Sequence, residues 1–90
     1  MFANSDKLTS IYDYCTIPNF VSDCSRMFYN CNNVLFNKIP ENFKLGKSVR
    51  YINSMFENCN NLIDLGGITI NEKIEQLEYA FKNTRISIDI

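Results

Sequence analysis

The sequence predicts an α/β fold, a short solenoid of about 3.5 helix-strand repeats with a parallel strand ribbon and the helices on the other side. The first observation is a repeated motif: MFYNCNNV at 27–34 returns as MFENCNNL at 55–62, with weaker copies MFANSDKL at 1–8 and AFKNTRI at 80–86. The second is that apolar residues precede each copy at helical spacing, while a short segment rich in Ile, Leu and Val follows it.

The repeat is anchored by one phenylalanine in each copy, with an asparagine two residues later. The steps between anchors are 26, 28 and 25 residues, within the range of units that stack into solenoids. We therefore expect one repeat domain, 1–90, with units of approximately 1–20, 21–47, 48–71 and 72–90. The anchors and their asparagines are Phe2 and Asn4, Phe28 and Asn30, Phe56 and Asn58, and Phe81 and Asn83.

Helices are predicted before the second, third and fourth anchors, at about 22–29, 48–57 and 72–82. Apolar residues recur seven, four and one residues before each of these anchors, and such offsets place them on one helical face. On the third helix, Glu72, Glu75 and Glu78 would share another face. The asparagine after each helix suits the left-handed conformation that ends a helix.

Short strands are predicted after each asparagine, in the segments LTSI (8–11), VLFNKI (34–39), LIDLGGI (62–68) and ISIDI (86–90). Helix and strand repeated at a fixed period give parallel strands beside parallel helices. Loops are expected at PNF (18–20), PENFKLGKS (40–48) and GGITINE (66–72), which hold both prolines and all three glycines.

The chemistry of the chain argues against an enzyme and against bound metal or cofactor. There is no histidine, so the commonest general base is missing and no imidazole is present to activate a cysteine. The four cysteines form no CxxC pair, which zinc sites usually contain. Cys31 and Cys59 share a repeat position with Ser5 and Thr84, so we expect small buried side chains there.

Charge and hydropathy limit the partners. The net charge is −1 and the pI about 5.2, so nucleic acid is not an expected ligand. The sequence has no apolar run of membrane-spanning length and no signal peptide, and as given it is expected to be cytoplasmic. Lys38, Lys44, Lys47 and Arg50 cluster in sequence, and in a stack this basic region would lie beside the glutamates of 72–78.

The pattern MFxxCxxL followed by a short Leu/Ile-rich strand resembles the BspA-like leucine-rich repeat of bacterial surface proteins, as a short truncated or miniature member. The resemblance is strongest over residues 21–36 and 49–65. It implies an LRR-like solenoid used for binding or adhesion, and it does not imply an enzyme. If the chain is a fragment of a longer adhesin, the cell surface is the expected location.

The expected function is protein binding, through the strand face or the open ends of the stack. The candidate contact residues are Leu35, Phe36, Ile63 and Asp64 on the strands and Tyr12, Tyr14 and Phe43 in loops beside them. A second copy is a further expected partner through the uncapped ends. Two alternatives stay open: a small inhibitor encoded by a phage or mobile element that blocks a host protein, and a fragment of a surface adhesin.

Overall fold

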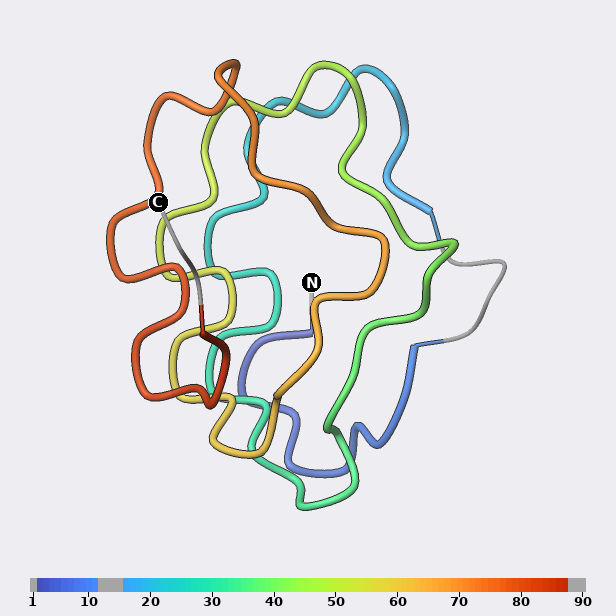
Figure 1. Ribbon diagram of the computed structural model, residues 1–90, viewed down its shortest axis with the longest axis vertical. Helices are drawn as coiled ribbons and strands as arrows, with labels where there is room; N and C mark the ends of the chain where they lie inside the picture. Colours follow the sequence, from blue (N-terminus) through green and yellow to red (C-terminus); the bar gives the residue numbers. More distant parts are fainter. Residues whose placement is uncertain (1, 12–15, 88–90) are drawn as a thin grey trace.

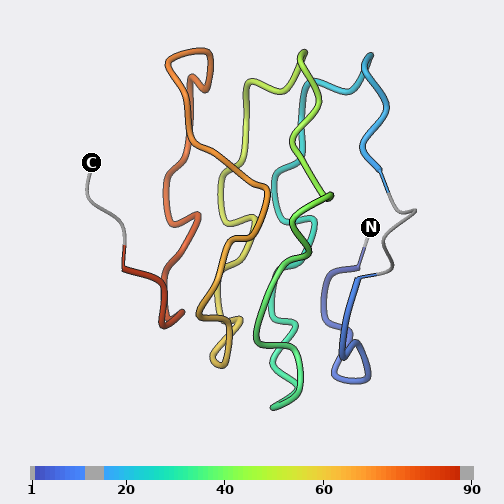
Figure 2. The ribbon, with the colours of Figure 1, turned by 45° about the vertical axis from the view of Figure 1, so that its right-hand side comes forward.

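The computed structural model describes residues 2–11 and 16–87 and shows a chain wound into stacked coils (Figure 1). Seen from the side, the coils lie next to one another in sequence order, with the first coil at one end of the stack and the last at the other (Figure 2). Successive coils follow the repeat, because the anchor phenylalanines of neighbouring units stack on each other.

The predicted α/β architecture is wrong. The described residues contain no helix, and their strand structure consists of isolated parallel bridges: Asp23 with Tyr51, Tyr51 with Gln76, and Lys38 with Asp64. The segments expected to be helical, 22–29, 48–57 and 72–82, consist largely of consecutive turns. Of the strands expected at 8–11, 34–39, 62–68 and 86–90, only the second and third contribute a bridge, a single residue each, within the described part of the chain.

The turn segments, residues 22–31, 50–59 and 75–84, use their N–H groups in alternation. In the first of them, Met27, Tyr29 and Cys31 each donate to the carbonyl three residues earlier, at 3.2 Å. The N–H groups between them point along the stack and donate to the next coil: Cys24 to Tyr51, Arg26 to Asn53, Phe28 to Met55 and Asn30 to Glu57, at 2.7–2.9 Å. An α-helix would keep all these bonds within the segment, so half of the backbone bonding here joins one coil to the next.

A left-handed backbone conformation at every fourth residue accompanies this alternation between N–H groups that bond within the segment and N–H groups that bond to the next coil. Arg26 and Asn30 have φ of 62° and 61°, and Ser54 and Asn58, then Tyr79 and Asn83, repeat the pattern. A chain that reverses hand every four residues also turns a side chain inward every three or four residues, which imitates helical periodicity. The expected left-handed conformation of the repeat asparagines is confirmed, at φ of 61–65° for Asn4, Asn30, Asn58 and Asn83, but each asparagine closes a turn and not a helix.

A column of phenylalanine rings forms the centre of the core. The rings of Phe2, Phe28, Phe56 and Phe81 are stacked nearly parallel, with centroids 5.2, 5.2 and 5.9 Å apart along the column. Phe28 and Phe56 are fully buried. From the opposite side of the coils, Phe36 and Phe43 pack against Phe28 at centroid distances of 6.0 and 5.9 Å. One aromatic cluster therefore joins the two sides of the second coil.

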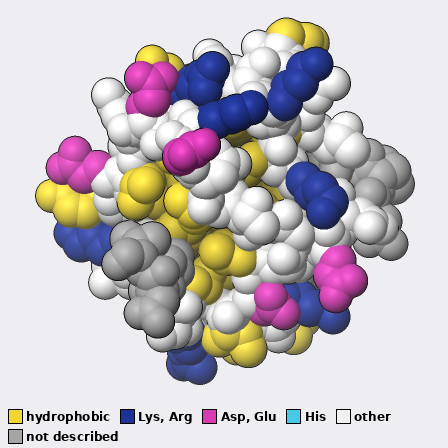
Figure 3. Space-filling model, turned by 45° about the horizontal axis from the view of Figure 1, so that its top comes forward, with side chains coloured by type: hydrophobic (Ala, Val, Ile, Leu, Met, Phe, Trp, Pro, Cys, Tyr) yellow, Lys and Arg dark blue, Asp and Glu magenta, His cyan; other side chains and the backbone are white. Residues whose placement is uncertain are grey.

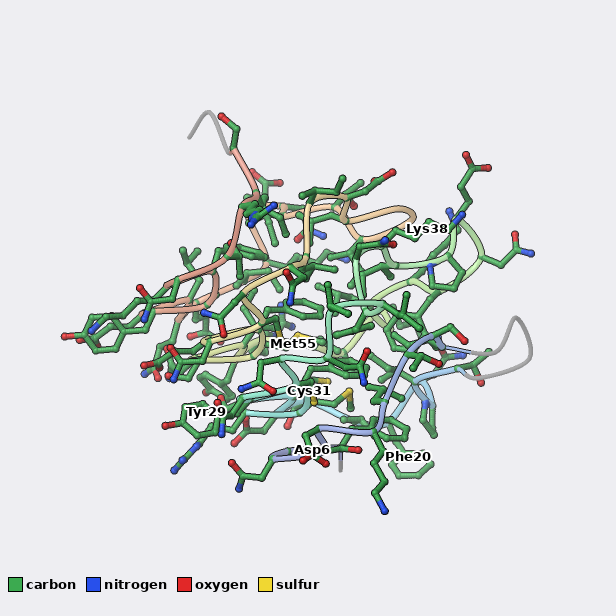
Figure 4. The ribbon with its side chains drawn as sticks, turned by 90° about the horizontal axis from the view of Figure 1, so that it is seen from below. Asp6, Phe20, Tyr29, Cys31, Lys38 and Met55 are labelled. Atoms are coloured by element: carbon green, nitrogen blue, oxygen red, sulfur yellow. The ribbon has the colours of Figure 1, made fainter. Side chains whose placement is uncertain are left out.

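Two buried thiols line this column and join neighbouring coils. The Cys31 Sγ donates to the carbonyl of Phe2 at 2.9 Å, and the Cys59 Sγ donates to the carbonyl of Phe28 at 3.0 Å. Figure 4 shows Cys31 and Met55 in the interior of the stack. The expected burial of Cys31 and Cys59 is confirmed; they and Cys24 are buried free thiols, and Cys15 lies outside the described residues. The neighbouring Cys31 thiol and burial both raise the pKa of Cys59.

Close approach of two coils requires the glycine pair at 66–67. Gly66 has a φ of +56°, and a Cβ at either position would overlap a backbone carbonyl of the preceding coil, that of Ile39 at Gly66 and that of Glu41 at Gly67. The pair was expected to be a turn, and residues 66 and 67 do form one. It lets the third coil lie directly against the second.

Candidate interaction surface

Three large apolar side chains are exposed a few residues after the turn segments 22–31 and 50–59. Val34 is 70% exposed, Leu35 64% and Ile63 59%; we call these three residues the corner patch. They belong to adjacent coils, which the Ile63 N–H joins through a 2.9 Å hydrogen bond to the carbonyl of Asn37. With this pairing, Leu35 and Ile63 lie one coil apart and two residues out of register. Both side chains face solvent, on adjacent coils.

Local polar contacts hold Leu35 outward. The Leu35 N–H is capped by the Asn33 side-chain oxygen at 2.9 Å, and the Asn33 amide donates to the carbonyl of Asp6 at 2.9 Å. This tight turn ends at Phe36, whose N–H donates to the carbonyl of Asn33 at 3.0 Å. Because the turn fixes Phe36 inward, the residues before it face solvent.

A groove of about 450 Å³ with mixed polar and apolar walls adjoins the corner patch, with Leu35 in its wall. The other wall residues come from the first two coils: Thr9, Ser10, Ile11, Asn37, Lys38, Pro40, Glu41 and Asn42. Its hydroxyl, amide and charged groups provide donors and acceptors next to an apolar surface. Interfaces between proteins commonly have this composition, an apolar centre with a polar rim.

Of the contact residues predicted from the sequence, some are exposed in the structure and others are buried. The expected exposure of Leu35, Ile63 and Asp64 is confirmed. The expected exposure of Phe36 and Phe43 is wrong, since both are buried against Phe28. Tyr12 and Tyr14 lie outside the described residues.

A two-residue shift between units explains the error at Phe36. On the turn side, Phe28 is equivalent to Phe56, an offset of 28 residues, whereas the bridge between Lys38 and Asp64 has an offset of 26. Phe36 is therefore equivalent to Leu62, and both are fully buried. The signal was present in the sequence, because Phe36 follows Cys31 at an offset of five residues but Leu62 follows Cys59 at an offset of only three.

Phe43 is buried because its loop folds back over the phenylalanine column. The Phe43 N–H donates to the carbonyl of Pro40 at 3.1 Å, which closes a turn, and the ring meets Phe28 edge-on with an interplanar angle of 73°. No repeat position marks this residue, and its direct neighbours Asn42 and Lys44 are polar. A loop of nine residues that returns to the core is not distinguishable by local sequence from one that stays outside.

Three exposed residues were missed by the sequence. Val34 was predicted to begin a short strand but was not among the predicted contacts, and neither were Phe20, which is 85% exposed, and Tyr79, which is 56% exposed. Lys82 lies over the Tyr79 ring, with Nζ 4.7 Å from its centroid, and Arg26 lies over Tyr29 in the same way at 4.2 Å. Figure 4 shows Tyr29 at the outer edge of the turn segments and Phe20 near the first coil.

The charged residues form no acidic face of the kind expected. Without a helix, Glu72, Glu75 and Glu78 do not share a helical face. Arg50 approaches Glu75 at 3.9 Å, with both side chains well exposed, so the pair contributes little to stability. Figure 3 shows Lys and Arg side chains interspersed with Asp and Glu around a central group of hydrophobic side chains on the face in view.

Metal and membrane sites were sought in the described part of the chain. It holds no group of three His, Cys, Asp or Glu residues placed to bind a metal ion. It also holds no helix with the length and apolar character needed to cross a bilayer. Comparison of the chain with protein-family models, curated proteins and solved structures finds no match.

Proposed function

We propose that this protein is a non-enzymatic protein-interaction module that binds a partner through the corner patch. The observation that carries the proposal is the exposure of Val34, Leu35 and Ile63 together on adjacent coils. Burying one such side chain is worth about 1.5–3 kcal/mol, so leaving three in water forgoes stabilisation that a partner could recover.

The surroundings of the patch favour a protein as the partner. Lys38 and Asp64 are exposed and paired across the two coils by their backbone bridge, so one positive and one negative group stand beside the apolar residues. Charges at a rim orient a partner and adjust its rate of association more than its affinity. The adjoining groove adds hydrogen-bonding groups on the side of the first coil.

The test is a comparison of two variants that remove exposed apolar residues from different places. In the first, Leu35→Ser and Ile63→Ser are combined; in the second, Phe20→Ser removes the most exposed large apolar side chain, which lies in a different turn. Partners are captured on the tagged parent chain and quantified by mass spectrometry. We expect the patch variant to lose at least about 90% of a specific partner, and Phe20→Ser to retain it.

Both variants should keep the parent's melting temperature within a few degrees, because exposed positions tolerate polar residues. Equal capture by the parent and the folded patch variant would exclude the corner patch as the binding site. Detection of catalytic turnover in the purified chain would contradict the non-enzymatic assignment.

A further inference from the structure

The second and third coils each carry a cysteine three residues after the anchor phenylalanine. Cys31 and Cys59 are both fully buried free thiols, and Figure 4 shows Cys31 in the interior of the stack. Ser5 and Thr84 hold the same position in the units on either side. The two thiols therefore stand at equivalent positions of adjacent coils and form a pair across one junction of the stack.

The backbones at this junction have the spacing of hydrogen-bonded strands. Asn30, which directly precedes Cys31, donates its N–H to the carbonyl of Glu57 at 2.7 Å. The anchor rings of the two coils stack with their centroids 5.2 Å apart and their planes 2° apart. Chains paired in this way run about 4.8 Å apart, and a disulfide joins Cα atoms that are about 4.4–6.8 Å apart. The backbone positions of Cys31 and Cys59 therefore suit a disulfide.

The Cys59 side chain points toward the coil that holds the other thiol. Its Sγ donates to the carbonyl of Phe28, in the second coil, at 3.0 Å. A hydrogen bond from the Cys59 thiol to the Cys31 sulfur lowers the pKa of Cys31, and the same contact raises the pKa of Cys59. The pair therefore loses a first proton more easily than a second, and Cys31 is the group that becomes the thiolate.

We propose that Cys31 and Cys59 are a redox modification site, at which hydrogen peroxide closes a disulfide across the junction of the second and third coils. The Cys31 thiolate attacks one peroxide oxygen, the O–O bond breaks, and Cys31 becomes a sulfenic acid while hydroxide leaves. The Cys59 sulfur then attacks the Cys31 sulfur, so that the S–S bond forms and the S–O bond breaks. The departing hydroxide takes the Cys59 proton and leaves as water. Two thiols are thereby oxidised, and one peroxide is reduced to two waters.

Burial of the two thiols determines which oxidant can use the site. Neither cysteine has exposed surface, so an oxidant reaches the sulfurs only when the junction between the coils opens locally. A peroxide is small and leaves a single oxygen atom on Cys31. A bulky disulfide would leave a whole thiol residue there, and a close-packed interior has no room for such a group. A peroxide is therefore favoured over a bulky disulfide as the oxidant.

The cross-link changes the stability of the stack more than its architecture. It joins positions that lie 28 residues apart in the chain, and closing such a loop removes conformational freedom from the unfolded chain. The two coils that it joins also carry Leu35 and Ile63 of the corner patch. The inference goes beyond the proposed function, because it does not depend on that patch binding a partner.

The experiment treats the folded, reduced 90-residue protein with hydrogen peroxide at neutral pH, alkylates the remaining thiols and digests the product with trypsin. Cys31 falls in the tryptic peptide 27–38 and Cys59 in the peptide 51–73, so mass spectrometry identifies a link between them directly. We expect this linked pair as the main product. The melting temperature should rise by at least about 10 °C over that of the reduced protein, and dithiothreitol should reverse both changes.

Two variants separate this pair from the other cysteines. Cys31→Ser introduces the residue that the first unit has at this position, and peroxide should leave its melting temperature unchanged. The Cys15→Ser, Cys24→Ala double variant keeps the pair and should give the same link and the same shift as the parent. If either variant fails to fold, the peptide map of the parent still decides the matter. Thiols that all remain open to alkylation, a link between other cysteines, a link that forms only in denaturant, or a linked protein that melts below the reduced one would each overturn the proposal.

Discussion

The inner coils of this stack have a neighbouring coil on both sides, whereas the outer coils have one on one side only. Phe28 and Phe56 have a ring on each side and are fully buried, whereas Phe2 and Phe81 have a ring on one side only and are half-buried. The partly buried apolar residues of the core lie mostly in the outer coils and their adjoining loops. The difference comes from neighbours and not from sequence, since all four phenylalanines hold the same repeat position.

The largest expected effect separates inner from outer anchors directly. Phe28→Ala or Phe56→Ala should lower the free energy of unfolding by about 3–5 kcal/mol, enough to unfold a small domain. Phe2→Ala and Phe81→Ala should cost about half as much, because less apolar surface is lost. Urea denaturation followed by tyrosine fluorescence measures all four, and equal costs would show that burial in the stack does not distinguish the coils.

A smaller effect tests the turn geometry of an inner coil. Asn58→Ala should lower the free energy of unfolding by about 1–2 kcal/mol, because alanine resists a φ of 65°. Ser54→Gly should raise it by about 0.5 kcal/mol, because glycine adopts the φ of 56° at this position freely. In a helix the same glycine would cost about 0.5–1 kcal/mol, so the sign of the change distinguishes turns from helix.

The smallest effect concerns the buried thiol of Cys24. Burial, and then the charge of Asp23, raises the pKa of Cys24. Its contribution to stability is complete below the pKa of the unfolded thiol, about 8.5, and is lost as pH rises from that value through the higher pKa of the folded thiol, at up to about 1.4 kcal/mol per pH unit. Cys24→Val should flatten this slope between pH 8 and 9.5, and an unchanged slope would assign it to other groups.

Sequence alone identified the repeat, its anchors and the left-handed asparagines, because these depend on residue identity at a fixed period. It did not identify the turns, since apolar residues spaced three and four apart fit both an α-helix and the consecutive turns of this structure. Asparagine signals positive φ, but Arg26, Ser54 and Tyr79 adopt it with no such preference. The N–H groups of Arg26 and Ser54 donate to carbonyls of the next coil. Those bonds are long-range, so no local window contains them.

For the candidate surface, the sequence placed Leu35, Ile63 and Asp64 correctly because their neighbours keep a clear in-out order. Phe36 and Phe43 failed because their burial depends on a shift between two units and on a loop that returns to Phe28.

The alternation of the N–H groups has a mechanical consequence. Half of the bonds in the turn segments run along the stack, and the first and last coils lie at its two ends (Figure 2). A force that pulls these ends apart acts on one junction between coils after another, and within a junction it opens the bonds in turn as in a zipper. Stretched between two attachment points, the molecule should lengthen in steps of about one unit each, at lower force than a sheet loaded in shear.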